Sequence, residues 1–397
     1  MNFMCVREMS VRQFISFFAA ATPVVLCGLA ALLSATPACA ADDVQTVLIG
    51  FAGGLGKRSL SNLSFSARDG AQMAVDDANQ RNLVIGGKRV FFKLLVSDDQ
   101  SDVNFARVVA KSFVTAGVVG VVGHVTTDTS IAAAPFYNEA GIPQISPTSA
   151  GRQFSQTGYR TAFQILGHSE ASAIHLANVA YDTLKARRIV VIDNSSMLGT
   201  SLAETFTRQI RRDGGDVLFR ETINSKTSDF NAVLPRVKNE RADLLFFAGT
   251  GPQAIAFSQN AQRMGVTSTL LLNGGAVNNE FPQTGSHRDG TYLMLQGLPV
   301  ETRSGYSQFE KAYRKKFDSA LTAYTMFSYD AVGMLIEACR KNNSLNARLA
   351  VETLHNMQYA GISGTISFAP DGSKNNPPYT LYRASQNKWQ IVKVFGG

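Results

Sequence analysis

Cysteine is scarce in this sequence. Of the four cysteines, only Cys339 lies beyond the first 40 residues. A single cysteine cannot form a disulfide within the chain, so the sequence excludes a small scaffold held together by disulfides. The surrounding segment, "SYDAVGMLIEACR", has helical spacing, and it predicts that Cys339 is a small apolar side chain on a helix face.

The motifs of common hydrolases and metalloenzymes are also missing. Neither H-E-x-x-H nor G-x-S-x-G occurs, and the five histidines are dispersed. The triplet His168-Ser-Glu170 matches half of a deaminase zinc motif, but the other half, P-C-x-x-C, does not occur. His124 directly follows an apolar run, and we predict a structural histidine there, with a place in a ligand cleft as the alternative. The sequence therefore predicts no metal, no cofactor and no catalytic residue.

No extended run of one charge sign occurs. The formal net charge is +8, and the short basic pairs at 57–58, 211–212 and 315–316 are far apart in the sequence. A nucleic-acid-binding surface needs a basic stripe, often with aromatic residues between the charges. We therefore predict no nucleic-acid partner.

Only one long apolar run occurs, from about Phe14 to Leu33. Two arginines precede this run, and the small-residue pattern "SATPACA" follows it. This order is typical of a secretory signal peptide. We therefore predict that residues 1–40 are removed by cleavage between Ala40 and Ala41 and that the mature chain is periplasmic.

Two other interpretations of this segment are less favoured. A membrane anchor would carry a basic stop-transfer flank after the apolar run, and no such flank follows. A lipid-attachment signal at Cys39 would usually have Leu three residues earlier, where this sequence has Thr36. We therefore expect simple secretion.

Apolar runs with strand character alternate with amphipathic helical segments along most of the chain. The predicted strands are Val47–Phe51, Phe91–Val96, Val118–Val122, Ile142–Ile145, Ile189–Ile192, Val217–Phe219, Leu244–Phe247, Leu270–Leu272 and Tyr292–Leu295. The predicted helices are Ser66–Gln80, Val103–Ala116, Ser130–Glu139, Ser169–Leu184, Thr200–Arg212, Phe230–Asn239 and Gln253–Met264. This alternation predicts an α/β fold of two doubly wound lobes, with parallel sheets covered on both faces.

The pattern changes after about residue 300. Helices are predicted over Tyr306–Lys316, Tyr329–Arg340 and Asn346–Asn356. A polar tail follows, with predicted strands at Ile366–Phe368, Tyr379–Arg383 and Trp389–Val394 and a turn at Asp371–Gly372.

Two clusters of hydroxyl residues follow two successive predicted strands. The first cluster holds Thr126, Thr127, Thr129 and Ser130, and the second holds Ser146, Thr148 and Ser149. Ligands of parallel sheets bind beyond the carboxyl ends of the strands, where helix N-termini favour anions. Each cluster alone fits a helix cap or a turn better than a site. Two clusters at one sheet edge favour a binding site for a carboxylate or a phosphate.

The segment after the first strand, "GFAGGLGKRSLSNLS", is rich in glycine. It is not a phosphate loop, because Phe51 and Arg58 break that pattern, and Ser59 breaks the dinucleotide-binding pattern. We predict a Gly-rich lip beside a cleft. Lys57 and Arg58 would either reach an anionic ligand or remain solvated.

The order of several motifs resembles the periplasmic substrate-binding proteins of ABC importers, most closely the leucine/isoleucine/valine-binding type. These motifs are "VLIGFAGGLG", "ARDGAQMAVDDAN", "VSDDQSD", "VVGVVGHVTTDTS", "FYNEAGIPQISPTSA" and "SYDAV". The resemblance covers essentially the whole chain after the leader, and the run from Gly123 to Ala150 is its most specific part.

This resemblance implies the type I periplasmic-binding fold, in which three crossovers join two Rossmann-like lobes around a ligand cleft. The lobes it implies are residues 44–163 with 300–357, and residues 164–299 with 358–397. Such proteins close around a small solute by hinge motion and present it to a membrane permease. We therefore expect a small-molecule ligand, an inner-membrane ABC permease as partner, and a monomer.

Positions that match the family's motifs give the expected ligand contacts. Thr127 matches the hydroxyl residue that holds the ligand's carboxylate, Thr148 a small residue that offers backbone contacts, and Tyr324 an aromatic wall. The full expected site is Thr126, Thr127, Asp128, Thr148, Ser149, Ala150, Leu198, Thr250, Gly275 and Tyr324.

Several of these positions depart from the family's pattern. Ala150 replaces a hydroxyl residue, and Leu198 and Thr250 replace aromatic residues. The acid that pairs with the ammonium of an amino-acid ligand corresponds to Gly275. A buried ammonium without a counter-charge is costly. Either Asp128 replaces this acid, or the ligand is not an ordinary α-amino acid.

The sequence therefore predicts an extracytoplasmic solute-binding protein. It would capture a small carboxylate-bearing solute, such as an amino acid or a related compound, by hinge closure and deliver it to an ABC import permease. The alternative is a periplasmic ligand-sensing subunit for a signalling receptor, which the same closed cleft would serve. An exported α/β enzyme is less favoured, because no pairing of a nucleophile with a base is recognisable.

Overall fold

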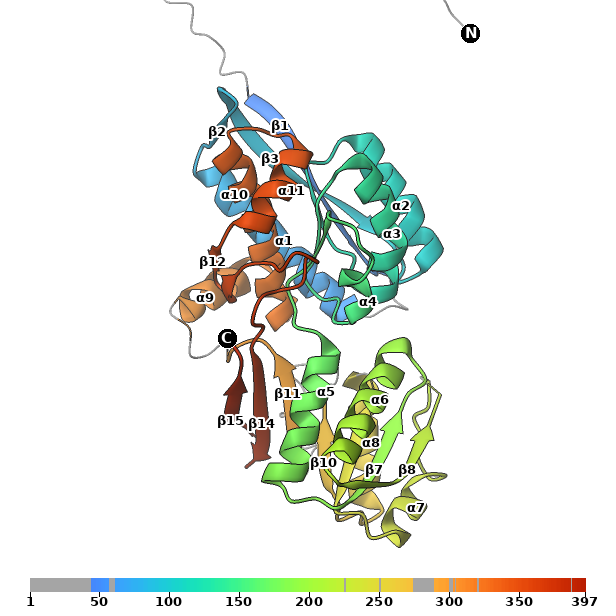
Figure 1. Cartoon of the computed structure of the whole chain (residues 1–397). Coiled ribbons are helices and arrows are strands. Elements are labelled where there is room, and N and C mark those ends of the chain that lie inside the picture. The colour runs from blue at the N-terminus through green and yellow to red at the C-terminus, as the bar shows by residue number, and fades with distance from the viewer. Residues whose placement is uncertain are drawn as a thin grey trace, which may run out of the picture. The chain divides into compact units, whose positions relative to one another are not determined.

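The structure is a computed structural model of the chain (Figure 1). It describes residues 44–56, 61–224, 226–249, 251–273, 289–299, 303, 305–319, 321–386 and 388–397. The predicted leader, residues 1–40, lies outside this part of the chain.

The first half of the chain forms a six-stranded sheet in the order β2-β3-β1-β4-β5-β6. Its strands are β1 (Val44–Gly53), β2 (Val84–Ile85), β3 (Lys88–Asp98), β4 (Val121–Val122), β5 (Gln144–Ser146) and β6 (Ala162–Gln164). All neighbours pair in parallel except β2 with β3. The carboxyl ends of β3, β1, β4 and β5 therefore lie side by side at one edge.

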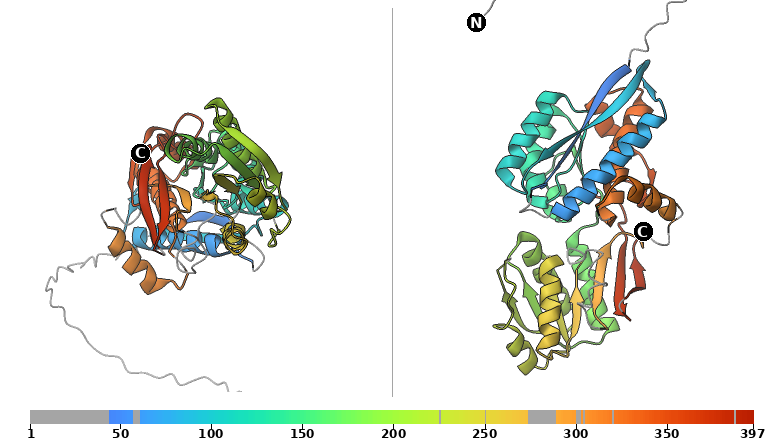
Figure 2. Two further views of the ribbon diagram at one scale, coloured as in Figure 1. Left: turned by 90° about the horizontal axis from the view of Figure 1, so that it is seen from below. Right: turned by 180° about the vertical axis from the view of Figure 1, so that it is seen from behind.

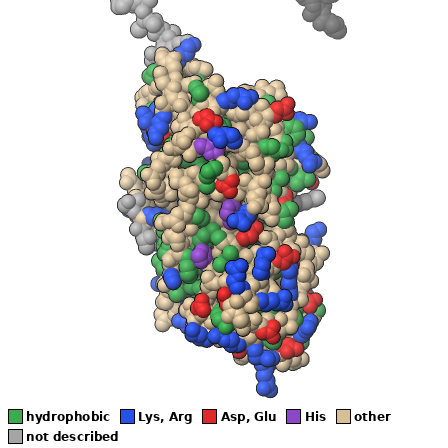
Figure 3. Space-filling model, in the orientation of Figure 1, with side chains coloured by type: hydrophobic (Ala, Val, Ile, Leu, Met, Phe, Trp, Pro, Cys, Tyr) green, Lys and Arg blue, Asp and Glu red, His purple; other side chains and the backbone are tan. Residues whose placement is uncertain are grey.

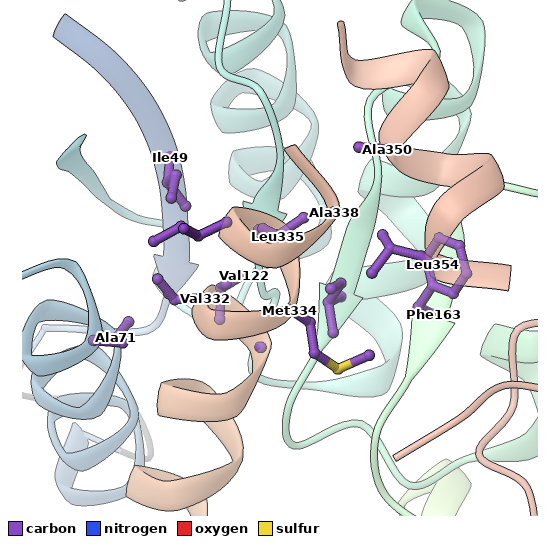
Figure 4. Close-up of a cluster of buried hydrophobic side chains, with 14 of the residues drawn as sticks. Ile49, Ala71, Val122, Phe163, Val332, Met334, Leu335, Ala338, Ala350 and Leu354 are labelled. Atoms are coloured by element: carbon purple, nitrogen blue, oxygen red, sulfur yellow. The ribbon is translucent and has the colours of Figure 1, made fainter. Parts of the chain in front are cut away.

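Helices cover both faces of this sheet, as the sequence predicts. The helices are α1 (Ser61–Gln80), α2 (Val103–Ala116), α3 (Thr127–Ala140), α4 (Arg152–Ser155), α9 (Tyr306–Lys316), α10 (Ala323–Asn342) and α11 (Ala347–Asn356). Side chains of α1, α10 and α11 form the core on one face, where Ile49, Val332 and Leu354 are fully or almost fully buried (Figure 4). Side chains of α2 and α3 form a second cluster on the other face.

The second sheet has seven strands in the order β15-β14-β11-β10-β9-β7-β8. Its strands are β7 (Arg188–Asp193), β8 (Asp216–Thr222), β9 (Leu244–Ala248), β10 (Thr269–Leu272), β11 (Tyr292–Gln296), β14 (Tyr379–Ser385) and β15 (Lys388–Phe395). Helices α5 (Ser169–Asn178) and α6 (Met197–Arg212) pack on one face, and α5 continues as a π-helical turn, Val179–Thr183. Helices α7 (Leu234–Asn239) and α8 (Gly251–Arg263) pack on the other face (Figure 2).

Local signals in the sequence explain most of the helix ends. The side chain of Asp102 caps the start of α2, and Gly117 ends it with φ of 70°. Gly141 ends α3 with the same φ, a left-handed conformation that glycine adopts without a steric penalty. The predicted ends of these helices, at Ala116 and Glu139, agree with the structure to within one residue.

Three predicted helix starts are wrong by four residues or more. Helix α1 begins at Ser61 rather than Ser66, and α10 begins at Ala323 rather than Tyr329, where Thr322 and Thr325 form a reciprocal cap. Helix α7 begins only at Leu234, so the predicted start at Phe230 is too early. Pro235 lies in the first turn of α7, the position at which its missing N–H costs nothing.

The polar tail is divided between the two sheets. Strands β14 and β15 extend the second sheet, whereas β12 (Tyr359–Gly361) and β13 (Gly364–Ile366) form a separate hairpin. Ile366 and Phe368 are nevertheless buried in the core of the first sheet, and Ser373 bridges to Gln164 of β6. The predicted boundaries of the two lobes stay a prediction.

Candidate functional site

The two hydroxyl clusters meet at the carboxyl edge of the first sheet. Strands β4 and β5 pair in parallel, with Val122 beside Ile145, so the loops that follow them are neighbours. The hydroxyl of Thr148 donates to the carbonyl of Val125 at 2.6 Å. The N–H of Gly151 donates to the hydroxyl of Thr127 at 3.2 Å. These two bonds join the segments 123–127 and 147–151 into one surface.

The first cluster forms the start of α3. Thr126 is the N-cap, and its hydroxyl accepts a bond from the N–H of Thr129 at 3.3 Å. Ser130 donates its N–H to the carbonyl of Thr126. A helix start has N–H groups without acceptors inside the helix and a partial positive charge. The first-turn N–H groups of Thr127 and Asp128 are therefore suited to an anion.

The second cluster is turned partly inward. Ser146 and Ser149 are fully or almost fully buried, and their hydroxyls lie 2.6 Å apart. Ser149 also lies 2.8 Å from the hydroxyl of Ser130 in α3. These side chains hold the two loops together, so Ser149 could meet a ligand only through its backbone. Ala150 is buried as well, with 8% of its surface exposed.

Two further predicted residues lie on the first-sheet side. Asp128 is exposed in the first turn of α3. Tyr324 lies in the first turn of α10, packs against the first core, and has its ring centroid 6.4 Å from that of Phe327. Burial raises the pKa of the Tyr324 hydroxyl above its usual value, so this group stays protonated and can donate a hydrogen bond.

The predicted residues from the second sheet are only partly placed. Leu198 lies in the first turn of α6, two residues after the N-cap Ser196, and packs against the second core. Thr250 and Gly275 lie outside the described residues.

Sequence reasoning missed a polar group at the carboxyl edge of the second sheet. Asp193 and Asn194, at the end of β7, are fully buried. Asn194 donates to the side chain of Gln253 at 3.0 Å, and Gln253 donates to the carbonyl of Asn224 at 2.9 Å. The signal for this group is "IDNSSMLG", where polar residues directly follow an apolar run as they do in the first sheet.

His124 lies beneath the joined loops, and its predicted structural role is confirmed. The side chain is completely buried, with Nδ1 2.7 Å from a carboxylate oxygen of Asp99 and Nε2 3.2 Å from the hydroxyl of Tyr137. Among the residues that the structure describes, no group of three His, Cys, Asp or Glu side chains is arranged to hold a metal ion.

Comparison with known proteins decides the family. A model of the family described as "Periplasmic binding protein" matches residues 56–388, most of the chain. The chain belongs to this family. The matched range contains the joined loops and the strands of both sheets, except β1 and nearly all of β15.

Curated relatives are similar over most of their length. A Leu/Ile/Val-binding protein homolog 1 of Brucella abortus is 24% identical over 316 residues, which cover 79% of this chain and 84% of the relative. An amino acid binding protein of Pseudomonas aeruginosa is 25% identical over 360 residues, covering 89% and 94%.

Solved structures share the two-lobed type I fold. The branched-chain amino acid binding protein LivJ of Streptococcus pneumoniae, in complex with isoleucine, superposes with a TM-score of 0.79 at 23% identity, covering 89% of this chain and all of that one. A solute-binding protein of Rhodopseudomonas palustris in complex with p-hydroxybenzoic acid gives 0.76 at 19% identity, covering 89% and 97%. The predicted α/β fold of this family is thereby confirmed.

None of the described helices is long and apolar enough to cross a membrane. Basic side chains are spread over the face shown in Figure 3, with acidic side chains among them. Family membership agrees with a place outside the cytoplasm.

Proposed function

We propose that this protein captures a small carboxylate-bearing solute in the periplasm and delivers it to an ABC import permease. The observation that carries this proposal is the joining of segments 123–127 and 147–151 at the start of α3. The relatives named above are solute-binding proteins rather than enzymes, and they support this role.

The grip on the carboxylate would come from the first sheet. The N–H groups of Thr127 and Asp128 and the hydroxyl of Thr127 would donate to its oxygens, and Thr148 would offer backbone contacts. Hydrogen bonds to a charged group are worth about 1.5–3 kcal/mol each. Hinge closure would then bring Leu198, Thr250 and Gly275 against the rest of the solute.

The remainder of the solute decides between two ligand classes. Two relatives are named for branched-chain amino acids, whereas the Rhodopseudomonas protein holds an aromatic acid. If the solute is an α-amino acid, Asp128 is the described carboxylate nearest in sequence to the grip and the first candidate partner for its ammonium. If the solute lacks an amine, no such partner is required.

Native mass spectrometry of the protein purified gently from periplasm tests this proposal. The released solute, collected after denaturation, is expected to be a small molecule with a carboxylate. Calorimetry with leucine, isoleucine, benzoate and 4-hydroxybenzoate would then follow on protein freed of solute. A released solute without a carboxylate, or turnover of a bound compound, would contradict the proposed function.

A further inference from the structure

The side chain of His124 connects two buried groups on different elements. One partner, Asp99, follows β3 and is 1% exposed, and the other, Tyr137, lies on the buried face of α3 and is fully buried. Both bonds are therefore shielded from water, and loss of either would leave a buried polar group without a partner, at a cost of about 1–3 kcal/mol.

The backbone of the same residue connects the two loops of the candidate site. Its carbonyl accepts hydrogen bonds from Ser130 of α3 at 3.0 Å and from Ser146 of β5 at 2.9 Å. The preceding N–H, of Gly123, donates to the carbonyl of Ile145 at 3.0 Å. Hydrogen bonds from both the ring and the backbone of His124 therefore hold the segment 123–127.

Asp99 extends this network to the remaining strands of the edge. Its N–H donates to the carbonyl of Gly53, the last residue of β1, and its carboxylate also accepts from the N–H of Ser101. The chain of bonds therefore runs across the ends of β3, β1, β4 and β5, which are consecutive in the sheet. It passes through the ring of His124 at its centre.

The two partners of the His124 ring determine which ring nitrogen donates a hydrogen bond and which accepts one. A carboxylate only accepts hydrogen bonds, so Nδ1 of His124 carries a proton and donates to Asp99. Burial, followed by the charge of Asp99, raises the pKa of Tyr137, which keeps its hydroxyl protonated. In the neutral ring, Nε2 then accepts from Tyr137.

We propose that His124 is a positioning residue whose ring holds segment 123–127 in place, so that the start of α3 and the 147–151 loop are organised before the solute arrives. An apolar residue of similar size could fill the space without fixing the segment. Preorganisation of this kind reduces the ordering cost of binding. The functional meaning rests on the proposed carboxylate grip, but the positioning itself does not require a ligand.

Hydrogen–deuterium exchange without ligand tests the proposal. The reporter amides are those of Thr129, Ser149 and Gly151, which donate to the hydroxyl groups of Thr126, Ser146 and Thr127, respectively. In His124→Leu we expect peptides covering 123–131 and 147–152 to exchange about tenfold faster than in the wild type. His124→Asn keeps a donor toward Asp99 and should restore most of the protection.

Tyr137→Phe and Tyr313→Phe form a matched pair. Each removes one buried tyrosine hydroxyl, but the hydroxyl of Tyr313 bonds to Ser319 in the α9–α10 region, away from the loops. Tyr137→Phe should loosen both segments, by less than His124→Leu, whereas Tyr313→Phe should leave them unchanged. Urea unfolding of all variants separates local loosening from a global loss of stability.

Unchanged exchange in both segments of His124→Leu and Tyr137→Phe would overturn the proposal. So would loosening of equal size in Tyr313→Phe, or no restoration by His124→Asn, because each would indicate a general effect on folding. If His124→Leu does not fold, the tyrosine pair and His124→Asn still decide. Failure of the proposed function appears separately, in the identity of the released solute.

Discussion

Polar side chains at the carboxyl edges of the two sheets have different hydrogen-bond partners. At the first edge, the hydroxyls of Ser130, Ser146 and Ser149 bond to one another and leave the start of α3 open to an anion. At the second edge, the carboxylate of Asp193 is satisfied within the protein by Arg220 at 2.8 Å and by Thr222 at 3.0 Å.

This difference determines which kind of charged ligand group each edge can bind. The first edge presents neutral donors on a framework held from beneath by His124. The second edge, in the residues that the structure describes, carries a buried carboxylate whose charge is already balanced by Arg220. Asp193 is therefore a structural acid and is not suited to pair with a ligand's ammonium. The first three predictions below test this contrast, and the fourth tests the pH dependence of two carboxylates elsewhere in the chain.

The largest effect is expected from Asp193→Ala. Removal of one partner from a buried pair typically costs 3–5 kcal/mol, and we expect about 3 kcal/mol because Arg220 is partly exposed. Urea unfolding measures this loss. Glu204→Gln is the matched control, because Glu204 is an exposed partner of Arg220 at 3.7 Å and should change stability by less than about 0.5 kcal/mol. Equal losses in both variants would refute the structural role of Asp193.

Thr127→Ala should weaken binding of the carboxylate solute by about 1.5–3 kcal/mol, since it removes a hydrogen bond to a charged group. Calorimetry with the solute identified by mass spectrometry measures the change. Thr157→Ala, which removes a hydroxyl bonded only to the carbonyl of Phe154 in the adjacent turn, should bind normally. Unchanged affinity in Thr127→Ala would refute the assignment of the carboxylate grip to the first edge.

A smaller and symmetric effect is expected at the two helix caps. Thr126 caps α3 at the first edge, and Ser196 caps α6 at the second by accepting from the N–H of Gly199 at 3.0 Å. Alanine at either position should lower stability by about 1 kcal/mol. Thermal and urea unfolding compare the two. If only Thr126→Ala also weakens solute binding, the contrast between the edges is sharpened.

The last prediction concerns the pH dependence of stability. Burial raises the pKa of Asp330 to about 6, although it accepts bonds from the N–H groups of Ile362 and Ser363. The pKa of Asp330 is higher in the folded protein than in the unfolded chain. Its contribution to the free energy of unfolding is therefore fully present below pH about 4 and is lost as pH rises toward about 6. In Asp330→Asn, that fall, up to about 1.4 kcal/mol per pH unit, should disappear from urea unfolding.

Asp371→Asn provides the control of opposite sign. Partial burial raises the pKa of Asp371, but hydrogen bonds from Ser373 outweigh it, so this pKa lies below its usual value. The contribution of Asp371 to the free energy of unfolding is lost as pH falls. Asp371→Asn should therefore remove an increase of stability with pH, opposite in sign to the change at Asp330. Identical slopes in the two variants would contradict both assignments.

The sequence was sufficient for much of the fold. Apolar runs such as Ile189–Ile192 form internal strands, and α2 and α3 end within one residue of their predicted ends. Three short strands, β2, β6 and β12, were not predicted, because segments of two or three residues carry no periodicity. The location of the candidate site could also be proposed from the sequence, since the hydroxyl clusters directly follow two parallel strands.

The details of the site depended on contacts between distant segments. The sequence places Thr126, Thr127 and Ser149 in hydroxyl clusters, but it does not say that Thr126 caps a helix or that Ser149 turns inward. The direction of a hydroxyl depends on which polar partner the fold brings near it, and one partner of Ser149, the hydroxyl of Ser130, is 19 residues away in the sequence.

Local chemistry in the sequence therefore determined the alternation of strands and helices, the helix ends and the edge at which a ligand would bind. Tertiary structure alone decided that Ile366 and Phe368 join the first core and that Asp99 and Tyr137 meet at His124. The physical reason is range: periodicity and caps act within a few residues, whereas burial and hydrogen-bond partners are set by packing across the whole sheet.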